Sequence, residues 1–146
     1  MSATMRRAKK NLPLFRAAGI QVNIDYSWFI VFFLVIWSLS AGYFPHRFPA
    51  MGITARWTAG ILTSILFFLS IVFHEFAHSL VANRMGISTR SITLFLFGGA
   101  SHLSREPKTP LSEFIISAAG PLASISLGFI LLGTSAHIPL VNYPVF

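Results

Sequence analysis

The hydrophobic residues of this chain are concentrated in three long stretches that carry almost no charge. The stretches cover about residues 26–44, 58–80 and 114–138. Each reaches the roughly 20 residues that a helix needs to cross the hydrocarbon core of a bilayer, which is about 30 Å thick. The pattern therefore predicts three transmembrane helices, the third of which contains a Gly120-Pro121 step that a bundled membrane helix tolerates.

Two shorter segments have the pattern of β-strands. Residues 20–25 alternate apolar and polar positions, as in a half-exposed strand. Residues 91–97 are rich in β-branched and aromatic residues and end in Gly98-Gly99, which indicates a turn. We therefore expect an all-α membrane protein with three transmembrane helices and a small β element at its cytoplasmic face. Residues 1–146 are expected to form one membrane-embedded domain.

The composition supports a membrane protein and limits the chemistry available to it. Hydrophobic residues make up 54% of the chain and charged residues only 10%, a balance that excludes an ordinary soluble domain. The chain has no cysteine, which excludes a disulfide framework, an iron–sulfur cluster and a thiolate metal site. Any metal ion must therefore be bound by nitrogen and oxygen ligands.

The net charge of +7 is distributed unevenly along the chain. Because Lys and Arg concentrate on the cytoplasmic side of membrane proteins, the distribution predicts a cytoplasmic N-terminus in an integral protein of the cell (plasma) membrane. The basic residues then face anionic lipid headgroups, so we expect the lipid bilayer and not a nucleic acid as partner. The basic residues predicted to be cytoplasmic are Arg6, Arg7, Lys9, Lys10, Arg16, Arg84, Arg90, Arg105 and Lys108. The basic residues predicted to lie outside are Arg47 and Arg56.

The first apolar stretch has a second interpretation as a cleaved signal peptide. Its apolar run is long for such a peptide, and Asp25 separates it from the basic segment. We therefore expect it to remain as a membrane span.

The candidate chemistry lies in the second stretch, which contains His74-Glu75-Phe76-Ala77-His78. Residues four apart lie on one face of a helix, so His74 and His78 are placed to bind a single metal ion. Glu75 is turned by about 100° from His74, which suits a base that takes a proton without binding the metal. Ionisable groups at membrane depth each cost about 2.5 to 3.5 kcal/mol and are therefore candidates for a functional site. The alternative is a histidine pair hydrogen-bonded between helices, with Glu75 as its counter-charge.

Four segments in order resemble the site-2 protease family, whose members are zinc metalloproteases that cut within membranes. One resembles the family's metal-binding helix, one the strand before its first span, one its glycine-bearing strand and one its third core span. The likeness covers nearly all of residues 19–135. The four segments are residues 73–79 (FHEFAHS), 19–28, 92–99 (ending LFGG) and 113–122 (EFIISAAGPL).

The resemblance implies a function and a set of site residues. It implies an intramembrane zinc metalloendopeptidase that cleaves membrane-spanning protein substrates in regulated proteolysis. Zn²⁺ would be held by His74 and His78, and Glu75 would act as the general base. The strand ending at Gly98 and Gly99 would hold an unwound substrate by β-strand addition, although a plain tight turn also explains these glycines.

The sequence departs from the family pattern in two places. Ser124 stands where the family often has Asn. The third zinc ligand of the family is an Asp in an Asn-Pro-x-x-x-x-Asp-Gly-like segment that the printed sequence does not contain. We therefore expect the N-terminal part of a longer protease.

Three alternatives follow from the missing ligand. In one, His102 supplies it locally. In another, the chain is a membrane metalloprotease whose third ligand comes from a different motif. In the last, the chain is a truncated, non-catalytic membrane protein that binds substrate or partner helices. The sequence specifies neither the substrate nor the oligomeric state.

Overall fold

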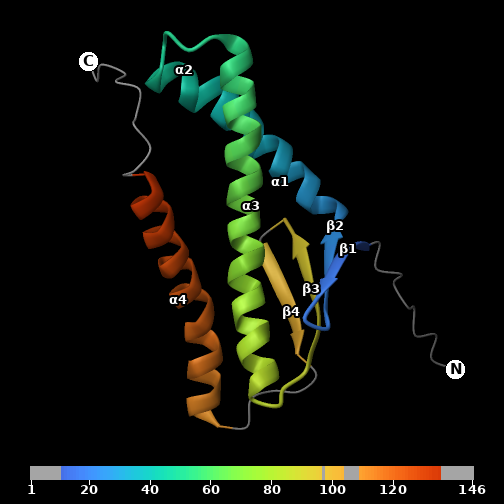
Figure 1. Cartoon of the computed structure of the whole chain (residues 1–146). Coiled ribbons are helices and arrows are strands. Elements are labelled where there is room, and N and C mark those ends of the chain that lie inside the picture. The colour runs from blue at the N-terminus through green and yellow to red at the C-terminus, as the bar shows by residue number, and fades with distance from the viewer. Residues whose placement is uncertain (1–10, 97, 104–108, 136–146) are drawn as a thin grey trace, which may run out of the picture.

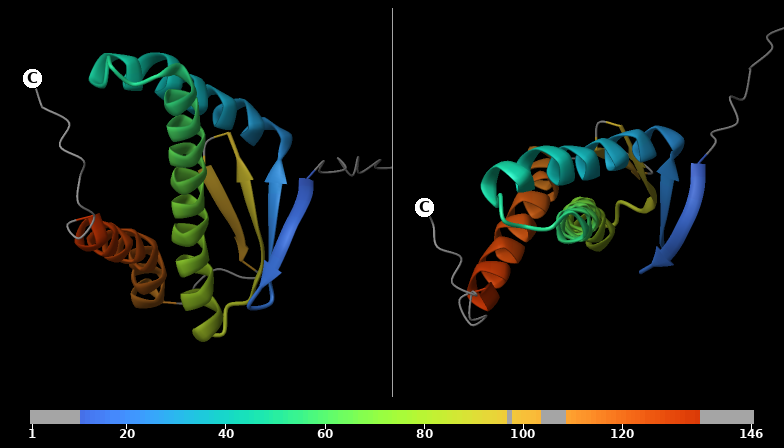
Figure 2. Two further views of the ribbon diagram at one scale, coloured as in Figure 1. Left: turned by 45° about the horizontal axis from the view of Figure 1, so that its top comes forward. Right: turned by 90° about the horizontal axis from the view of Figure 1, so that it is seen from above.

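A single long helix organises the molecule, with another helix on one side of it and a β-sheet on the other (Figures 1 and 2). The structure is a computed structural model that describes residues 11–96, 98–103 and 109–135. The central helix is α3, and its two neighbours are α4 and the sheet. In chain order the elements are β1 (Asn11–Ala17), β2 (Ile20–Asp25), α1 (Tyr26–Trp37), the π-helical turn η1 (Ser38–Tyr43), α2 (Phe44–Arg47), α3 (Ile53–Arg84), β3 (Thr89–Phe95), β4 (Gly98–Leu103) and α4 (Pro110–Ser135).

The three predicted membrane-length helices are present. Three continuous helical segments are long and apolar enough to cross a membrane, and they are Tyr26–Arg47, Ile53–Arg84 and Pro110–Thr134. The first is formed by α1, η1 and α2 together, and α4 continues through Pro121. Residues 136–138, the end of the third predicted span, lie outside the described residues.

The β element is larger than the sequence predicted, so the class "all-α" is incomplete. The structure has a four-stranded sheet in the order β1-β2-β3-β4 beside the helices. β1 and β2 form an antiparallel hairpin, β2 and β3 are parallel, and β3 and β4 are antiparallel. The sequence did not predict β1. Both faces of this strand are largely exposed, so it lacks the alternation of apolar and polar residues that marks a half-buried strand.

The glycines at 98 and 99 were predicted to form a turn after a strand, and this prediction is wrong. β3 ends at Phe95, whereas Gly98 and Gly99 are the first residues of β4 and lie opposite Phe95 and Leu94. Pairing with β3 satisfies backbone groups that a turn would leave free, which outweighs the low strand preference of glycine. Because β4 is last in the strand order, both glycines lie on an edge strand of the described sheet.

The hydrophobic core joins the inner face of the sheet to α1 and α3. β2 buries every second residue, as its alternating pattern predicts. The α3 residues that pack against this core precede the His74–His78 motif or lie inside it, so core packing fixes the helix that carries the motif. The buried residues are Ile20, Ile24, Ile92 and Leu94, and the side chains packed against them are Trp28, Phe29, Ile71, Val72 and Phe76.

A glycine cap ends α3 and reverses the chain toward the sheet. Gly86 has a φ of +77°, a left-handed conformation that glycine adopts without a steric penalty. The N–H of Ile87 donates to the carbonyl of Ala82 at 2.9 Å, and the N–H of Thr89 donates to Asn83 Oδ1 at 2.6 Å. The chain therefore enters β3 directly after the helix and runs back along α3 (Figure 1).

The first helical segment crosses α3 at a position where only a small residue fits. A Cβ atom on Gly60 would overlap Ser40 Oγ, and it would lie 3.3 Å from Ser40 Cβ and 3.4 Å from the carbonyl oxygen of Ile36. Ser64, one turn further along α3, is fully buried and donates to the carbonyl of Gly60 at 2.7 Å. The Gly60-x-x-x-Ser64 spacing thus provides the small-residue contact that lets two membrane helices approach closely.

This contact makes a testable prediction about stability. We expect Gly60→Val to destabilise the fold by about 1 to 3 kcal/mol, because the added atoms overpack the crossing with η1. Thermal unfolding of the purified protein in detergent measures the effect. Gly128→Val is the matched control, since a Cβ at Gly128 meets no atom within 4 Å. Equal melting temperatures for the two variants would contradict the close crossing.

Candidate metal centre

His74 and His78 lie one turn apart on α3, and their Nε2 atoms are 3.1 Å apart. The ring centroids are 4.8 Å apart, with an interplanar angle of 77°. Two nitrogen ligands that each bind a tetrahedral zinc ion at about 2.0 to 2.1 Å are separated by about 3.3 Å. The two Nε2 atoms are thus within a few tenths of an ångström of the spacing that a shared zinc ion requires.

The other ring nitrogen of each histidine is held by α4. His78 Nδ1 lies 2.6 Å from the carbonyl oxygen of Ile116, and His74 Nδ1 lies 2.8 Å from Ser124 Oγ. A carbonyl only accepts, so His78 Nδ1 donates this hydrogen bond, and the Nε2 atoms of the two rings lie within hydrogen-bonding distance of each other. Partners of this kind fix the ring orientation and tautomer of metal-binding histidines.

Gly120 provides the space in front of the two imidazoles. A Cβ atom at this position would lie 2.6 Å from His74 Nε2 and 2.6 Å from His78 Cε1, and it would overlap His78 Nε2. The side chain of any other residue would therefore collide with the Nε2 atoms of both histidines. The absence of a side chain at Gly120 leaves a cradle that fits a metal ion.

Ile116, Gly120 and Ser124 are four residues apart, so they lie on one face of α4 and contact the histidines in successive turns. Sequence reasoning found none of these roles: it noted Gly120 only as part of a tolerated Gly-Pro step and Ser124 only as a departure from the family pattern. Ile116 contributes only a backbone carbonyl, which every residue has. The sequence shows that Gly120 and Ser124 are small residues, but it does not show that they contact the histidines of α3.

Glu75 lies on a different side of α3 from the two histidines and contacts the sheet. A Cβ atom on Gly99 would overlap Glu75 Cγ and would lie 2.8 Å from Glu75 Cδ. The carboxylate therefore packs directly against the backbone of the edge strand β4. The two imidazoles contact α4 and the carboxylate contacts β4, a separation that follows from the angular offset along the helix.

Four of the five predicted site residues make direct contacts in the structure, as two pairs: His74 with His78, and Glu75 with Gly99. The fifth, Gly98, precedes Gly99 in the same strand. Gly99 has a specific role in this contact. Because glycine has no side chain, its backbone leaves room for the side chain of Glu75.

The described part of the chain does not hold three grouped His, Cys, Asp or Glu residues that could bind a metal ion. Asp25 caps α1 by accepting from the N–H of Ser27 at 2.9 Å, and Glu113 lies in the first turn of α4. His46 lies in α2, at the other end of the first helical segment from the sheet. The backbone of His102 is in β4 opposite Ser91, but its side chain lies outside the described part, as does all of His137.

Comparison with known proteins identifies relatives that share this region. The family model described as peptidase family M50 matches residues 62–142. The chain is 42% identical over 124 residues to the Synechocystis sp. protein named "Putative zinc metalloprotease sll0528", covering 84% of this chain and 32% of the relative. It is 33% identical over 137 residues to zinc metalloprotease MJ0392 of Methanocaldococcus jannaschii, covering 92% and 36%.

A solved structure agrees with the sequence matches. The fold is similar to that of the site-2 protease from Methanocaldococcus jannaschii, with a TM-score of 0.64 and 32% identity over 88% of this chain and 52% of that chain. The chain spans about a third of the length of the curated relatives named above. The matched family segment covers more than half of the chain and contains the histidine pair, Gly120 and Ser124. The chain therefore belongs to peptidase family M50, the site-2 protease family.

Proposed function

We propose that this chain forms the catalytic region of an intramembrane zinc endopeptidase that cuts membrane-spanning proteins in regulated proteolysis. The observation that carries the proposal is the pair of Nε2 atoms 3.1 Å apart in front of Gly120. A histidine pair that only linked two helices would not require a residue without a side chain against both Nε2 atoms. The Gly120 cradle is therefore better explained by a bound ion.

His74 and His78 would hold Zn²⁺ through Nε2, while Ser124 and the Ile116 carbonyl keep the rings oriented through Nδ1. When bound, zinc supplies Lewis acidity, which activates a water molecule and polarises a carbonyl group. Catalytic zinc sites normally use three protein ligands, so we assign the third to a residue outside the described part of the chain.

Glu75 would act as the general base. Its carboxylate lies on the same stretch of α3 as the two histidines, but it is turned toward β4, where a bound peptide would run. From there it can take a proton from the attacking water and pass it to the leaving amine. Its packing against the backbone of Gly99 restrains the side chain.

The edge of β4 at Gly98 and Gly99 would hold the substrate. Peptide carbonyls in a transmembrane helix are hidden in hydrogen bonds, so a protease must bind the segment in an unwound form. An edge strand supplies backbone partners for such a segment by β-strand addition. Because Gly99 contacts Glu75, a peptide on this edge would pass the catalytic carboxylate.

We further propose that the N-terminus is cytoplasmic in the plasma membrane, which places the C-terminal end of α3 near the cytoplasmic face. The described basic residues support this orientation. Arg16 is in β1, Arg90 is in β3 and Arg84 ends α3, whereas Arg47 ends α2 and Arg56 is in the first turn of α3. The sheet and the C-terminal end of α3 lie at one end of the molecule, and α2 and the start of α3 lie at the other (Figure 1).

The first prediction for this proposal concerns the base. Glu75→Gln should lower cleavage of a single-span substrate by about 10²- to 10⁴-fold and leave bound zinc unchanged, because the amide keeps the shape of the side chain but cannot accept the proton. Proteolysis in liposomes and elemental analysis measure the two effects. Glu113→Gln makes the same chemical change at an exposed position of α4 and should have no effect. Cleavage at the parental rate by the Glu75 variant would exclude it as the base.

The second prediction separates the two glycine contacts. Gly120→Ala should reduce both zinc content and cleavage, because the methyl group enters the space between the imidazoles. Gly99→Ala should reduce cleavage but retain zinc, because it displaces only Glu75. Gly128→Ala adds the same methyl group to α4 where no atom lies within 4 Å and should change neither. Full zinc content in the Gly120 variant would refute the proposed metal site.

The third prediction concerns orientation. A reporter inserted between α2 and α3, in the loop after Phe48, should be active only outside the cytoplasm. The same reporter fused before β1 should be active only in the cytoplasm. The opposite pair of results would reverse the proposed topology without affecting the catalytic assignments.

A further inference from the structure

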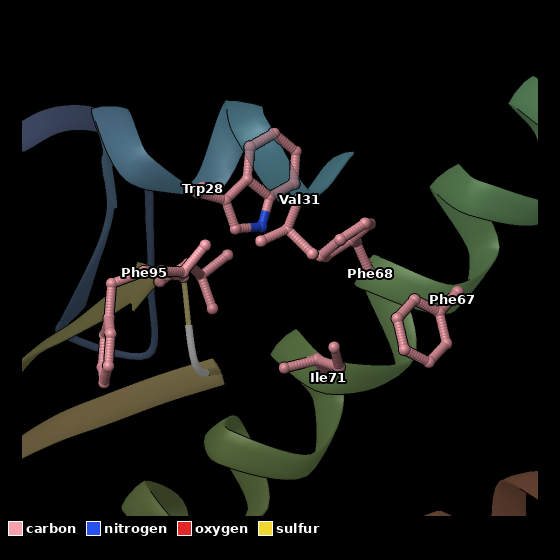
Figure 3. Close-up of a pocket in the computed structure, with 8 residues that line it drawn as sticks. Trp28, Val31, Phe67, Phe68, Ile71 and Phe95 are labelled. Atoms are coloured by element: carbon pink, nitrogen blue, oxygen red, sulfur yellow. The ribbon is translucent and has the colours of Figure 1, made fainter. Parts of the chain in front are cut away.

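A cavity separate from the metal centre lies between the start of α1, the middle of α3 and the end of β3 (Figure 3). Its volume is about 230 Å³, and none of His74, Glu75 and His78 lines it. Its walls are aliphatic and aromatic. The lining residues are Trp28, Val31, Phe67, Phe68, Ile71, Leu94, Phe95 and Leu96.

The cavity adjoins the part of the site that holds Glu75. Ile71 and Phe68 precede Glu75 by four and seven residues, so all three lie on one face of α3. At about 1.5 Å per residue, these two positions are about 6 Å and 10 Å from Glu75 along the helix axis. Leu94 connects the regions from the other side, because it pairs directly with Gly99, which contacts Glu75.

We propose that this cavity is a specificity pocket for a bulky apolar side chain of the substrate. The pocket would take the second or third residue from the scissile bond, on the side of the bond that continues into the membrane. This inference rests on the proposed proteolytic function. An extended chain advances about 3.3 Å per residue, so two or three residues cover the distance from Glu75 to the cavity walls.

The direction follows from the place of the cavity on α3. Phe67 and Phe68 lie at the midpoint of this 32-residue helix, whereas Glu75 lies nearer its C-terminal end. In a helix that spans the bilayer, the cavity is therefore deeper in the membrane than the carboxylate. A substrate segment that runs from Glu75 to the cavity would come from the membrane interior, where its side chains are apolar.

The size of the cavity suits one side chain. An apolar cavity of about 150 Å³ accommodates benzene, so a volume of about 230 Å³ accommodates a phenylalanine, leucine or methionine side chain. A pocket for a larger organic ligand usually has at least about 300 Å³.

One polar group favours a peptide over a lipid acyl chain as the occupant. Among the residues that the structure describes, Trp28 Nε1 is buried and has no hydrogen-bond partner, and Figure 3 shows it turned toward the space between the lining side chains. A buried donor without an acceptor lowers stability, and an occupant that brings an acceptor removes this penalty. An unwound peptide has free carbonyl groups beside each side chain, whereas the apolar part of an acyl chain has none.

Disulfide crosslinking can test the pocket, because the chain contains no native cysteine. Val31→Cys places a thiol in the cavity wall, and Ile30→Cys places one on the neighbouring residue, which is 64% exposed and does not line the cavity. Both are made with Glu75→Gln so that bound substrate is not cut. The probe is a single-span substrate with one cysteine moved through successive positions around its cleavage site.

We expect Val31→Cys to crosslink at least tenfold more strongly at the second or third position on the membrane side than elsewhere. Ile30→Cys should show no such maximum. The same profile for both variants, or a maximum on the other side of the scissile bond, would overturn the proposal.

A second experiment fills the pocket and measures substrate preference. The unmodified protein should cleave a substrate with Phe or Leu at the crosslinked position roughly 10- to 100-fold faster than one with Ala there, from the burial of one large side chain. Val31→Trp should reduce this ratio to less than about threefold, and Ile30→Trp should leave it unchanged. An unchanged ratio in Val31→Trp would show that the cavity is only a packing gap.

The outcomes also separate the pocket from the proposed function. If the unmodified protein cleaves the substrate but the crosslinks have no maximum, the pocket is wrong and the protease assignment stands. If the full-length protein that includes this chain and the third zinc ligand does not cleave any single-span substrate, the proposed function fails and the pocket fails with it.

Discussion

The close approach of α4 to α3 at Gly120 is the constraint on which the candidate site depends. At this point the backbone of one helix touches the two imidazoles of the other, without a side chain between them. The approach also brings the Ile116 carbonyl and Ser124 Oγ within hydrogen-bonding distance of the histidines. A wider separation of the helices would remove these partners, so this one contact fixes the orientation of both imidazoles.

α3 carries the site because it is packed on two sides by different kinds of structure. The sheet contacts it through large apolar side chains, including Ile71 and Phe76, which fix the helix in position. α4 contacts it through a smaller cluster, in which Ala82, Ile87 and Ile116 are buried, and through the polar contacts of the histidines. Apolar packing on the sheet side thus holds α3 in place, while the side that faces α4 carries the two imidazoles. Their hydrogen bonds to α4 offset the free-energy cost of removing these polar groups from water.

Glycine has a distinct physical role at each of the close contacts along α3. At Gly60 it allows the first helical segment to cross, at Gly120 it lets α4 approach the two imidazoles, and at Gly99 it accommodates the Glu75 side chain. All three are contacts between elements that are distant in sequence. A Cβ atom at any of them would separate two elements by more than the tolerance of a close-packed interior.

The sequence by itself determined the three membrane-length helices, the β2 strand and the placement of two histidines on one helix face. These features depend on local periodicity, which is fixed within a few turns or strand residues. Residues 20–25 are an example, because their alternation survives unchanged in the structure. The angular offset of Glu75 from the histidines also follows from helix geometry alone.

Only the tertiary structure decided which groups complete the site. Gly98 and Gly99 have the local signature of a turn, yet pairing with β3 makes them the start of an edge strand. β1 has no usable alternation and is a strand because β2 lies beside it. The roles of Gly120, Ser124 and the Ile116 carbonyl arise from contact with residues about 40 to 50 positions away. Such contacts depend on how helices pack, and no local pattern in a single sequence encodes them.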